Sequence, residues 1–343
     1  MLTATLIQAD TIKFLTKRGC FRDSSGLKLK ADACVTDPPY GFDFSGGKDW
    51  DTFADSRSHS TAADDSEQFA KFTEAWSYRI RINVLRPGAH LLAFTAGRTI
   101  GPVDRGLQRA GYHIPRVIFW LYASGQVKNP NDLRPGCEPI FIGRNDKDSN
   151  GRQLTDRGLG DMFKKDGLGQ LHAQTWKEED GKHPTDVLLD ESLVAGFEEV
   201  ACIVDQHPGT FFVTKPTPKD RDAYCADLPL QKKDNRLSHM TSNYTGKVVK
   251  DVMAQNIHPT VKPIELMRRL IRLVSRPGHT IIDPFLGSGT TGIAALLEGR
   301  NFIGVEREPD YFKIASTRIT TVLREVTGSD VAAPFIVSEE VTT

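Results

Sequence analysis

The sequence lacks the features that mark secreted, membrane-spanning or zinc-binding proteins. Its five cysteines are scattered and none forms a Cys-x-x-Cys pair, which argues against a structural zinc site and for a reducing compartment. No apolar run approaches the ~18 residues of a membrane span, and residues 1–4 lack the basic and then apolar pattern of a signal peptide. We therefore expect a cytoplasmic protein without a metal ion.

The chain also lacks a net charge, because 44 basic residues are balanced by 44 acidic ones. Charge alone therefore gives no indication of a nucleic-acid partner, and any basic surface must come from uneven placement of these residues. The 343 residues are 39% hydrophobic and 26% charged, which is ordinary for a globular protein. This length can bury a large core and could hold two domains.

The most informative stretch of the first half is the tetrad Asp37-Pro38-Pro39-Tyr40, which directly follows the apolar run 33–35. A short apolar stretch broken by two prolines is typical of a buried strand that ends in a stiff loop. In open α/β sheets, ligands bind at this carboxyl edge of the strands. Taken alone, however, the tetrad is better explained as a turn capped by a tyrosine, so its interpretation depends on a second loop downstream.

Apolar periodicity predicts strands that alternate with helices on both sides of a long polar region. In the first half we expect strands at 5–7, 31–36, 90–94, 114–122 and 138–143, and helices at 11–15, 69–85 and 103–110. In the second half we expect helices at 263–274, 290–297 and 311–323, and strands at 280–282 and 301–305. This alternation indicates a doubly wound α/β fold with a mostly parallel sheet.

Three polar stretches interrupt or follow these elements. Residues 144–257 are expected to form an insertion with its own role and with short strands at 187–189 and 211–214, because a structureless loop of this length is uncommon. The stretch 42–68 follows the tetrad directly and is predicted to be a mobile loop that closes over a ligand. The tail 327–343 shows no firm element and is expected to fray.

The second loop, residues 283–291, has the sequence DPFLGSGTT and joins a predicted strand to a predicted helix. Its glycines allow a ligand to approach the backbone, and Glu306 at the end of the next strand is placed to accept hydrogen bonds from a ribose diol. The loop lacks the Lys-Ser/Thr that follows the last glycine of a phosphate-binding loop. An adenosine ligand without phosphates fits better, although a short glycine loop alone is unspecific.

Together, the strand–DPPY and strand–DPFLGSGTT–helix units resemble the amino-group DNA methyltransferases that use S-adenosylmethionine. The tetrad precedes the cofactor loop, as in the β class of phage or bacterial type, and HPTVKP at 258–263 strengthens the resemblance. The resemblance implies a Rossmann-like methyltransferase sheet with circularly permuted motif order. Its parts would be a catalytic half at 1–143, an inserted target-recognition region at 144–257, a cofactor-binding half at 258–326 and a flexible tail at 327–343.

The resemblance also implies which residues contact S-adenosylmethionine. The loop residues that would line it are Asp283, Phe285, Gly287 and Gly289. Glu306 would hold its ribose, and Thr260 with Lys262 would contact its methionine carboxylate, although helix capping and a surface lysine are alternatives of comparable weight. The permuted order implies that strand 5–7 supplies the third strand of the cofactor half. Asp10 would then lie near the adenine, with a helix N-cap as an equal alternative.

The tetrad has a chemistry that suits this cofactor. An aromatic amino group is a poor nucleophile, because its lone pair is delocalised into the ring. If Asp37 and the carbonyl group of Pro38 each accept one N–H, the lone pair is directed at the sulfonium methyl group and the developing positive charge is stabilised. Tyr40 would stack on a base that has been flipped out of the duplex. The methyl group then passes in one displacement step without a covalent intermediate.

The leading hypothesis is a site-specific DNA adenine-N6 methyltransferase, because Asp at the first position of the tetrad is typical of adenine enzymes. A cytosine-N4 enzyme is the first alternative, since the same cradle accepts that amino group. An alternative of another class is a DNA-binding protein that has lost catalysis. The expected partner is double-stranded DNA, and the residues leave open whether the protein forms a homodimer and whether a restriction enzyme accompanies it.

Basic, amide and aromatic side chains in the insertion are candidates for DNA contacts, although a solvated loop explains each of them equally well. They are Lys232, Lys233, Asn235, Arg236, Asn243, Tyr244 and Lys247. The segment His183-Pro184-Thr185 repeats the start of the HPTVKP motif but lacks the Val-Lys-Pro continuation. We interpret this second copy as a chance match.

Overall fold

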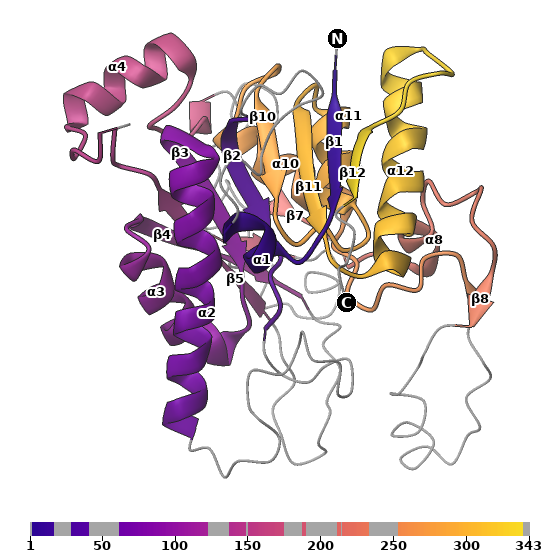
Figure 1. Cartoon of the computed structure of the whole chain (residues 1–343), viewed down its shortest axis with the longest axis horizontal. Helices are drawn as coiled ribbons and strands as arrows, with labels where there is room; N and C mark the ends of the chain where they lie inside the picture. Colours follow the sequence, from indigo (N-terminus) through magenta and orange to yellow (C-terminus); the bar gives the residue numbers. More distant parts are fainter. Residues whose placement is uncertain are drawn as a thin grey trace, which may run out of the picture.

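The computed structural model describes residues 2–16, 29–40, 62–122, 137–148, 150–174, 187–189, 211–213, 215–232 and 253–338. These residues form a ten-stranded sheet with helices on both faces (Figure 1). Among them, no helix combines the length and the apolar character that crossing a membrane requires.

The central strands of the sheet run parallel in the order β1, β11, β10, β2 and β3. Their bounds are Ala4–Gln8, Asn301–Glu306, Thr280–Asp283, Ala31–Thr36 and Leu85–Phe94. β1 therefore supplies the third strand of the cofactor half, as the permuted motif order predicted. The strand β12 (Phe335–Ser338) adds to the outer side of β1 in parallel.

The other side of the sheet contains a reversed strand. β5 (Cys137–Arg144) lies between β3 and β4 (His113–Leu121) and is antiparallel to both. β6 (Val187–Leu189) and β7 (Phe211–Phe212) then extend the sheet in parallel with β4. A separate antiparallel pair consists of β8 (Gln231–Lys232) and β9 (Met253–Ala254). The two short strands predicted inside the insertion are thus confirmed, and they belong to the main sheet.

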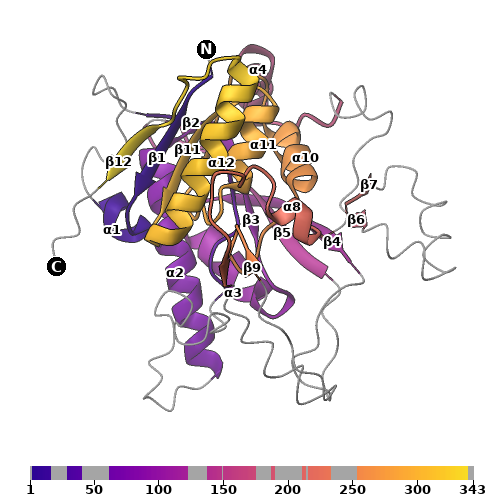
Figure 2. The ribbon, with the colours of Figure 1, turned by 90° about the vertical axis from the view of Figure 1, so that its right-hand side faces the viewer.

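Each face of the sheet has its own core, because successive strand side chains point to opposite faces. Along β2, for example, Ala33 and Val35 pack into one core and Cys34 into the other. The core that contains Cys34 is covered by α1 (Thr11–Thr16), α2 (Ala62–Asn83) and α3 (Ile100–Arg109), which the short helix η1 (Gly97–Thr99) precedes. The other core is covered by α10 (Ile264–Val274), α11 (Thr290–Leu297) and α12 (Pro309–Thr327), which lie side by side in Figure 2.

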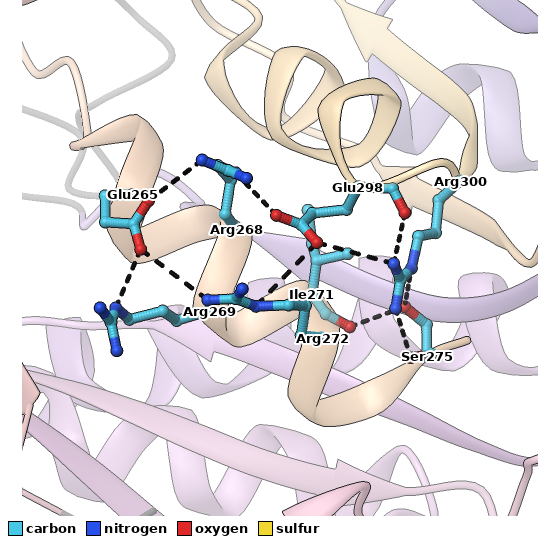
Figure 3. Close-up of polar contacts among 8 residues, drawn as sticks. All are labelled: Glu265, Arg268, Arg269, Ile271, Arg272, Ser275, Glu298 and Arg300. Atoms are coloured by element: carbon cyan, nitrogen blue, oxygen red, sulfur yellow. Dashed lines mark hydrogen bonds and ion pairs between the residues drawn. The ribbon is translucent and has the colours of Figure 1, made fainter. Parts of the chain in front are cut away.

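A network of arginine and glutamate side chains joins α10 to the turn after α11 (Figure 3). Arg268 pairs with Glu298 at 2.7 Å and with Glu265 at 3.3 Å. Arg300 donates to the backbone oxygen of Ser275 at 2.8 Å. Single exposed ion pairs stabilise little, but several held in one network restrain the helices that carry them. The network therefore holds the HPTVKP segment, which enters α10, in register with the cofactor loop, which enters α11.

The predicted insertion begins with a segment that lies away from the two motif loops. The backbone N–H of Gly88, near the amino end of β3, donates to Asn145 at 2.8 Å, and Gly169 donates back to Gly88 at 2.8 Å. The backbone N–H of His172 donates to the carbonyl group of Leu273, in the last turn of α10. Residues 144–174, including α4 (Asp156–Asp166), are thereby fastened at the amino edge of the sheet, where Figure 1 shows α4 at the top. This part of the insertion therefore lies at the edge of the sheet opposite the two motif loops.

Other expectations from the sequence need correction. The tail was predicted to lack any firm element, yet β12 lies within it, because its backbone finds partners on β1. The stretch 42–68 was predicted to be a loop, yet α2 already begins at Ala62; residues 42–61 lie outside the described residues. Strand β3 begins at Leu85 and not at 90, with an irregular register opposite Ala31 and Ala33 that accommodates Pro87.

Candidate active site

The tetrad and the cofactor loop lie next to each other at the carboxyl ends of β2 and β10, which are hydrogen-bonded neighbours. The chain leaves β10 through α11 toward β11 on one side and leaves β2 through α2 toward β3 on the other. This arrangement is a topological switch point, where open α/β sheets bind their ligands. The two motifs that the sequence singled out are therefore brought together at this edge.

Asp283 shapes the beginning of the cofactor loop. Its carboxylate accepts hydrogen bonds from the hydroxyl groups of Thr36 at 2.7 Å and Thr291 at 2.6 Å, and from the backbone N–H of Phe285 at 3.0 Å. The carboxyl group is almost fully buried, and burial raises its pKa to about 6 despite these donors. Asp283 thus ties β10, β2 and α11 together, and its predicted contact with the cofactor stays a prediction.

The two glycines of the loop occupy backbone positions that other residues rarely adopt. Gly287 has φ +54° and Gly289, at the N-cap of α11, has φ +85°. A Cβ atom on Gly287 would lie 2.8 Å from Nε2 of His258, and one on Gly289 would lie 3.1 Å from the backbone of Ala315. The loop therefore requires glycine at both positions, for its conformation and for the close approach of neighbouring chain.

Glu306 stands at the end of β11 and closes the loop from the other side. One carboxylate oxygen accepts from the backbone N–H of Gly287 at 2.7 Å, and the other accepts from the backbone N–H of Glu308 at 2.9 Å. Burial raises the pKa of Glu306 to about 7, against the opposing effect of these hydrogen bonds. Glu306 is thus a buried acid beside the glycine loop, at the position where the sequence predicted a ribose site. Its contact with a ribose stays a prediction.

The remaining predicted cofactor residues lie around the same edge. Phe285 packs edge to face against Trp76 of α2, with ring centroids 5.5 Å apart. Asp10 follows β1 and accepts from the backbone N–H of Lys13 at 2.9 Å, so the N-cap alternative is present in the structure. Its other oxygen lies 3.6 Å from Arg307, the residue after Glu306. The placement beside β11 also agrees with an adenine-side position, which stays a prediction.

Lys262 makes contacts that the sequence did not predict. Its ammonium group forms an ion pair with Oδ2 of Asp37 in the tetrad and lies 3.2 Å from Oε2 of Glu138. Burial disfavours the charge on Lys262, but the two carboxylates outweigh this effect and raise the pKa of the ammonium group above its ordinary value. Thr260, two residues earlier, is exposed and bonded to His258. The contact of either residue with the methionine carboxylate stays a prediction.

The tetrad itself is a hydrogen-bonded unit. The hydroxyl group of Tyr40 donates to Oδ1 of Asp37 at 2.6 Å and lies 3.4 Å from Glu138. Burial raises the pKa of Asp37, the nearby Lys262 opposes this increase and Glu138 adds to it. Burial likewise raises the pKa of the Tyr40 hydroxyl, reinforced by the charge of Asp37. Pro38 is buried and Pro39 is half-buried, so the backbone that presents Asp37 is held in place directly after it.

Glu138 is a site residue that the sequence interpretation missed. It is the second residue of β5, and it also accepts from the hydroxyl group of Tyr122, the residue after β4, at 3.3 Å. Because β5 runs antiparallel to β3, its first residues meet the edge at which the parallel strands end. The sequence showed an acid at the start of a strand, but only the strand direction reveals that this start faces the tetrad.

The cofactor loop and the HPTVKP segment are also held by residues that sequence reasoning did not single out. Arg221, at the end of α8 (Pro218–Arg221), donates to the carbonyl groups of His258 at 2.7 Å and Pro259 at 2.9 Å. The buried Arg318 of α12 donates to the carbonyl groups of Ser288 at 2.6 Å and Ala223 at 2.9 Å. The segment 217–223 of the insertion is thereby fastened to both motifs.

Several predicted residues lie outside the described part of the chain. They are Lys233, Asn235, Arg236, Asn243, Tyr244 and Lys247, together with His183-Pro184-Thr185 and residues 42–61 of the predicted loop. Lys232 is described and is exposed at the end of β8. The interpretation of these residues as DNA contacts, as a chance match or as a closing loop stays a prediction.

The fold and the site define a Rossmann-like α/β methyltransferase, in which a proline-rich acidic tetrad lies beside an adenosine-type glycine loop. The family model described as DNA methylase, for N6 and N4 amino-group enzymes, matches residues 31–317, and the chain belongs to this family. The type II methyltransferase M2.DpnII of Streptococcus pneumoniae is 41% identical over 328 residues, which are 92% of this chain and 88% of that protein. The type II methyltransferase M.BglI of Bacillus subtilis is 42% identical over 73 residues, or 21% of each chain.

A solved structure has a similar fold. The PvuII DNA methyltransferase, described as cytosine-N4-specific, has a TM-score of 0.53 at 13% identity, over 98% of this chain and 95% of that one. The protein is thus an amino-group DNA methyltransferase that uses S-adenosylmethionine. The residues fit this cofactor, because Gly287 and Gly289 leave the loop backbone without side chains and Glu306 offers a buried acceptor beside it.

Proposed function

We propose that the protein is a site-specific methyltransferase that modifies the exocyclic N6 of adenine in double-stranded DNA. The observation that supports this proposal is the hydrogen bond from Thr36, the residue before the tetrad, to Asp283, the first residue of the cofactor loop. This contact sets the acid that accepts the target amino group beside the site of the methyl donor. The first position of the tetrad is Asp, which favours adenine over cytosine by resemblance to the family.

In this proposal S-adenosylmethionine supplies the methyl group, and Gly287, Gly289 and Glu306 hold its adenosine part. The base is flipped out of the duplex, because its amino group cannot be reached inside the stack. Asp37 and the carbonyl group of Pro38 accept the two amino hydrogens and direct the nitrogen lone pair toward the methyl group. The carboxylate of Asp37 stabilises the positive charge that develops on the nitrogen, without reorganisation during the reaction.

Residues of the insertion after 174 are proposed to recognise the target sequence. The segment 217–223 is fastened to both site motifs by Arg221 and Arg318, so this part of the insertion lies at the same edge as the tetrad. Residues 144–174 are held at the opposite edge and are not part of this proposed role.

The test is nucleoside mass spectrometry of DNA that the pure protein has methylated. Unmodified double-stranded DNA is incubated with S-adenosylmethionine and digested to nucleosides, and we expect N6-methyladenine. Detection of N4-methylcytosine alone would replace the proposal by the cytosine-N4 alternative, whose amino group fits the same cradle. Sequencing of the methylated DNA in the same experiment would identify the recognition sequence.

A further inference from the structure

The tetrad belongs to a cluster in which two carboxylates share one ammonium group. Lys262 contacts Oδ2 of Asp37 on one side and lies 3.2 Å from Oε2 of Glu138 on the other. The hydroxyl group of Tyr40 is shared in the same way, at 2.6 Å from Asp37 and 3.4 Å from Glu138. Glu138 is therefore a second acceptor for both donors that hold Asp37.

This sharing matters because both oxygens of Asp37 are already occupied. Each carboxylate oxygen has two lone pairs, so a target amino group that donates to Asp37 shares an oxygen with Lys262 or with Tyr40 and weakens that contact. If Asp37 were the sole carboxylate beside Lys262, weakening this ion pair would cost free energy, because a buried ammonium group has little water to replace its partner. The side chain of Lys262 is only 9% exposed, so a second carboxylate within reach removes most of this cost.

The charges of the cluster point to the same role. Asp37 and Glu138 contribute two negative charges and Lys262 one positive charge, which leaves a surplus of one negative charge near the tetrad. Without Glu138, the charge of Asp37 would be neutralised by Lys262 throughout the reaction. With Glu138, the surplus faces the nitrogen on which positive charge develops, where a preorganised charge stabilises the transition state.

We propose that Glu138 is a positioning residue that holds Lys262 and Tyr40 while Asp37 accepts the target amino group. The inference rests on the proposed function of Asp37 and adds a named partner to it. Tyr122, the residue after β4, supports Glu138 through its hydroxyl group, at 3.3 Å. This shift requires no proton transfer and no change of covalent bonds, since Lys262 only moves from between the two carboxylates toward Glu138.

The test compares the wild type with Glu138→Gln, which keeps the shape and removes the charge. At saturating cofactor we expect kcat to fall roughly 100-fold, because Asp37 and the target amino group would then be misplaced relative to each other, and a small misplacement of reacting groups costs a factor of this size. Binding of S-adenosylmethionine, measured by calorimetry, should change by no more than about twofold, because Glu138 contacts neither the glycine loop nor Glu306 in the structure.

A pH profile separates positioning from a purely structural role. The ionisable groups around Asp37 are Tyr40 beside it, Lys262, Glu138 on β5, Tyr122 just after β4 and Asp283 on β10. The charge of Glu138 raises the pKa of Asp37, so its removal should lower that pKa. The acidic limb of kcat/KM for DNA should then move to lower pH in Glu138→Gln. An unchanged kcat together with an unmoved limb would overturn the inference.

Two further variants keep the test decisive. Glu67→Gln removes an exposed carboxylate that pairs with Arg109, away from the tetrad, and should leave kcat and the pH profile unchanged. If Glu138→Gln does not fold, Glu138→Asp decides, since it keeps the charge but withdraws it by one methylene. We expect this variant to lower kcat without moving the acidic limb, and full activity in it would overturn the inference.

Failure of this inference can be told apart from failure of the proposed function. If the wild type transfers no methyl group to any DNA, or if Asp37→Ala remains active, the proposed function fails. If the wild type is active and Asp37→Ala is inactive, but Glu138→Gln behaves as the wild type, only the role of Glu138 is overturned.

Discussion

The hydroxyl group of Thr36 donates a hydrogen bond of 2.7 Å to Asp283, although 247 positions separate the two residues in the sequence. Thr36 is the last residue of β2 before the tetrad, and Asp283 is the last residue of β10 before the glycine loop. This buried bond joins the ends of the strands that carry the two motifs. It fixes the position of the tetrad relative to the glycine loop.

Replacement of Thr36 by valine tests this connection. The shape is preserved, but Asp283 loses one of its donors and stays buried, so we expect a loss of about 1–2 kcal/mol in the free energy of unfolding. The pKa of Asp283 should rise further above about 6, because burial is then less compensated. Denaturant unfolding and a pH titration measure the two effects. Thr36→Ser keeps the hydroxyl group and serves as the control; equal stability of all three proteins would contradict the prediction.

Replacement of Asp37 by alanine should abolish methyl transfer while cofactor binding survives. The carboxylate is expected to accept the target amino group, whereas the glycine loop and Glu306 are expected to hold the cofactor. A labelled-methyl transfer assay and calorimetry with S-adenosylmethionine measure the two properties. Asp161→Ala, on the exposed side of α4 at the opposite edge, is the control. A folded Asp37→Ala protein that no longer binds the cofactor would mean that the roles of the two loops are misassigned.

Replacement of Gly287 by alanine should weaken cofactor binding about tenfold or more. The loop must then adopt a backbone conformation that is strained for alanine, and the free-energy cost of such strain corresponds to a change of this size. The new Cβ atom would meet the ring of His258 at 2.8 Å, and φ at +54° disfavours any residue with a side chain. Gly101→Ala in α3 is the matched control, because its Cβ atom would meet only Arg105 at 3.6 Å. Calorimetry compares the two variants, and equal affinity would refute the prediction.

Cofactor affinity should depend on pH through Glu306. Its pKa of about 7 lies above the ordinary 4.5, so the acid is largely protonated below pH 7 and offers fewer acceptor sites to a ribose diol. We expect the Kd of S-adenosylmethionine to fall by at most about tenfold per pH unit as pH rises toward about 7. Above this pH the Kd should level off. Calorimetry over this range measures the slope. Glu306→Gln should bind weakly with a flat profile, and a flat wild-type profile would contradict the assignment.

Glu306 also makes the stability of the fold depend on pH, and stability changes with pH in the opposite direction to cofactor affinity. Because the folded state raises the pKa of Glu306, it holds a proton that the unfolded chain releases between pH 4.5 and about 7. The stabilising contribution is therefore complete below pH 4.5 and is lost as pH rises through about 7. Stability and cofactor affinity thus favour opposite protonation states of one carboxyl group.

Much of the fold could be predicted from local pattern, because periodicity and turn residues report on single elements. The strand at 5–7 was correctly assigned to the cofactor half, and the short strands at 187–189 and 211–214 were recognised. The strand β12 was missed, since its four residues acquire their hydrogen-bond partners only from β1. The extent of α2 was missed because residues 62–68 show little apolar periodicity.

The sequence by itself determined the chemistry of the site. The tetrad around Asp37 and the glycine loop that leads to Glu306 each consist of neighbouring residues whose types define an amino-group methyltransferase. Only the tertiary structure decided what surrounds Asp37. Lys262 reaches it from the start of α10, and Glu138 reaches it because β5 runs against its neighbours. The direction of a strand and the partner of a long side chain depend on contacts between distant segments, which a local pattern does not encode.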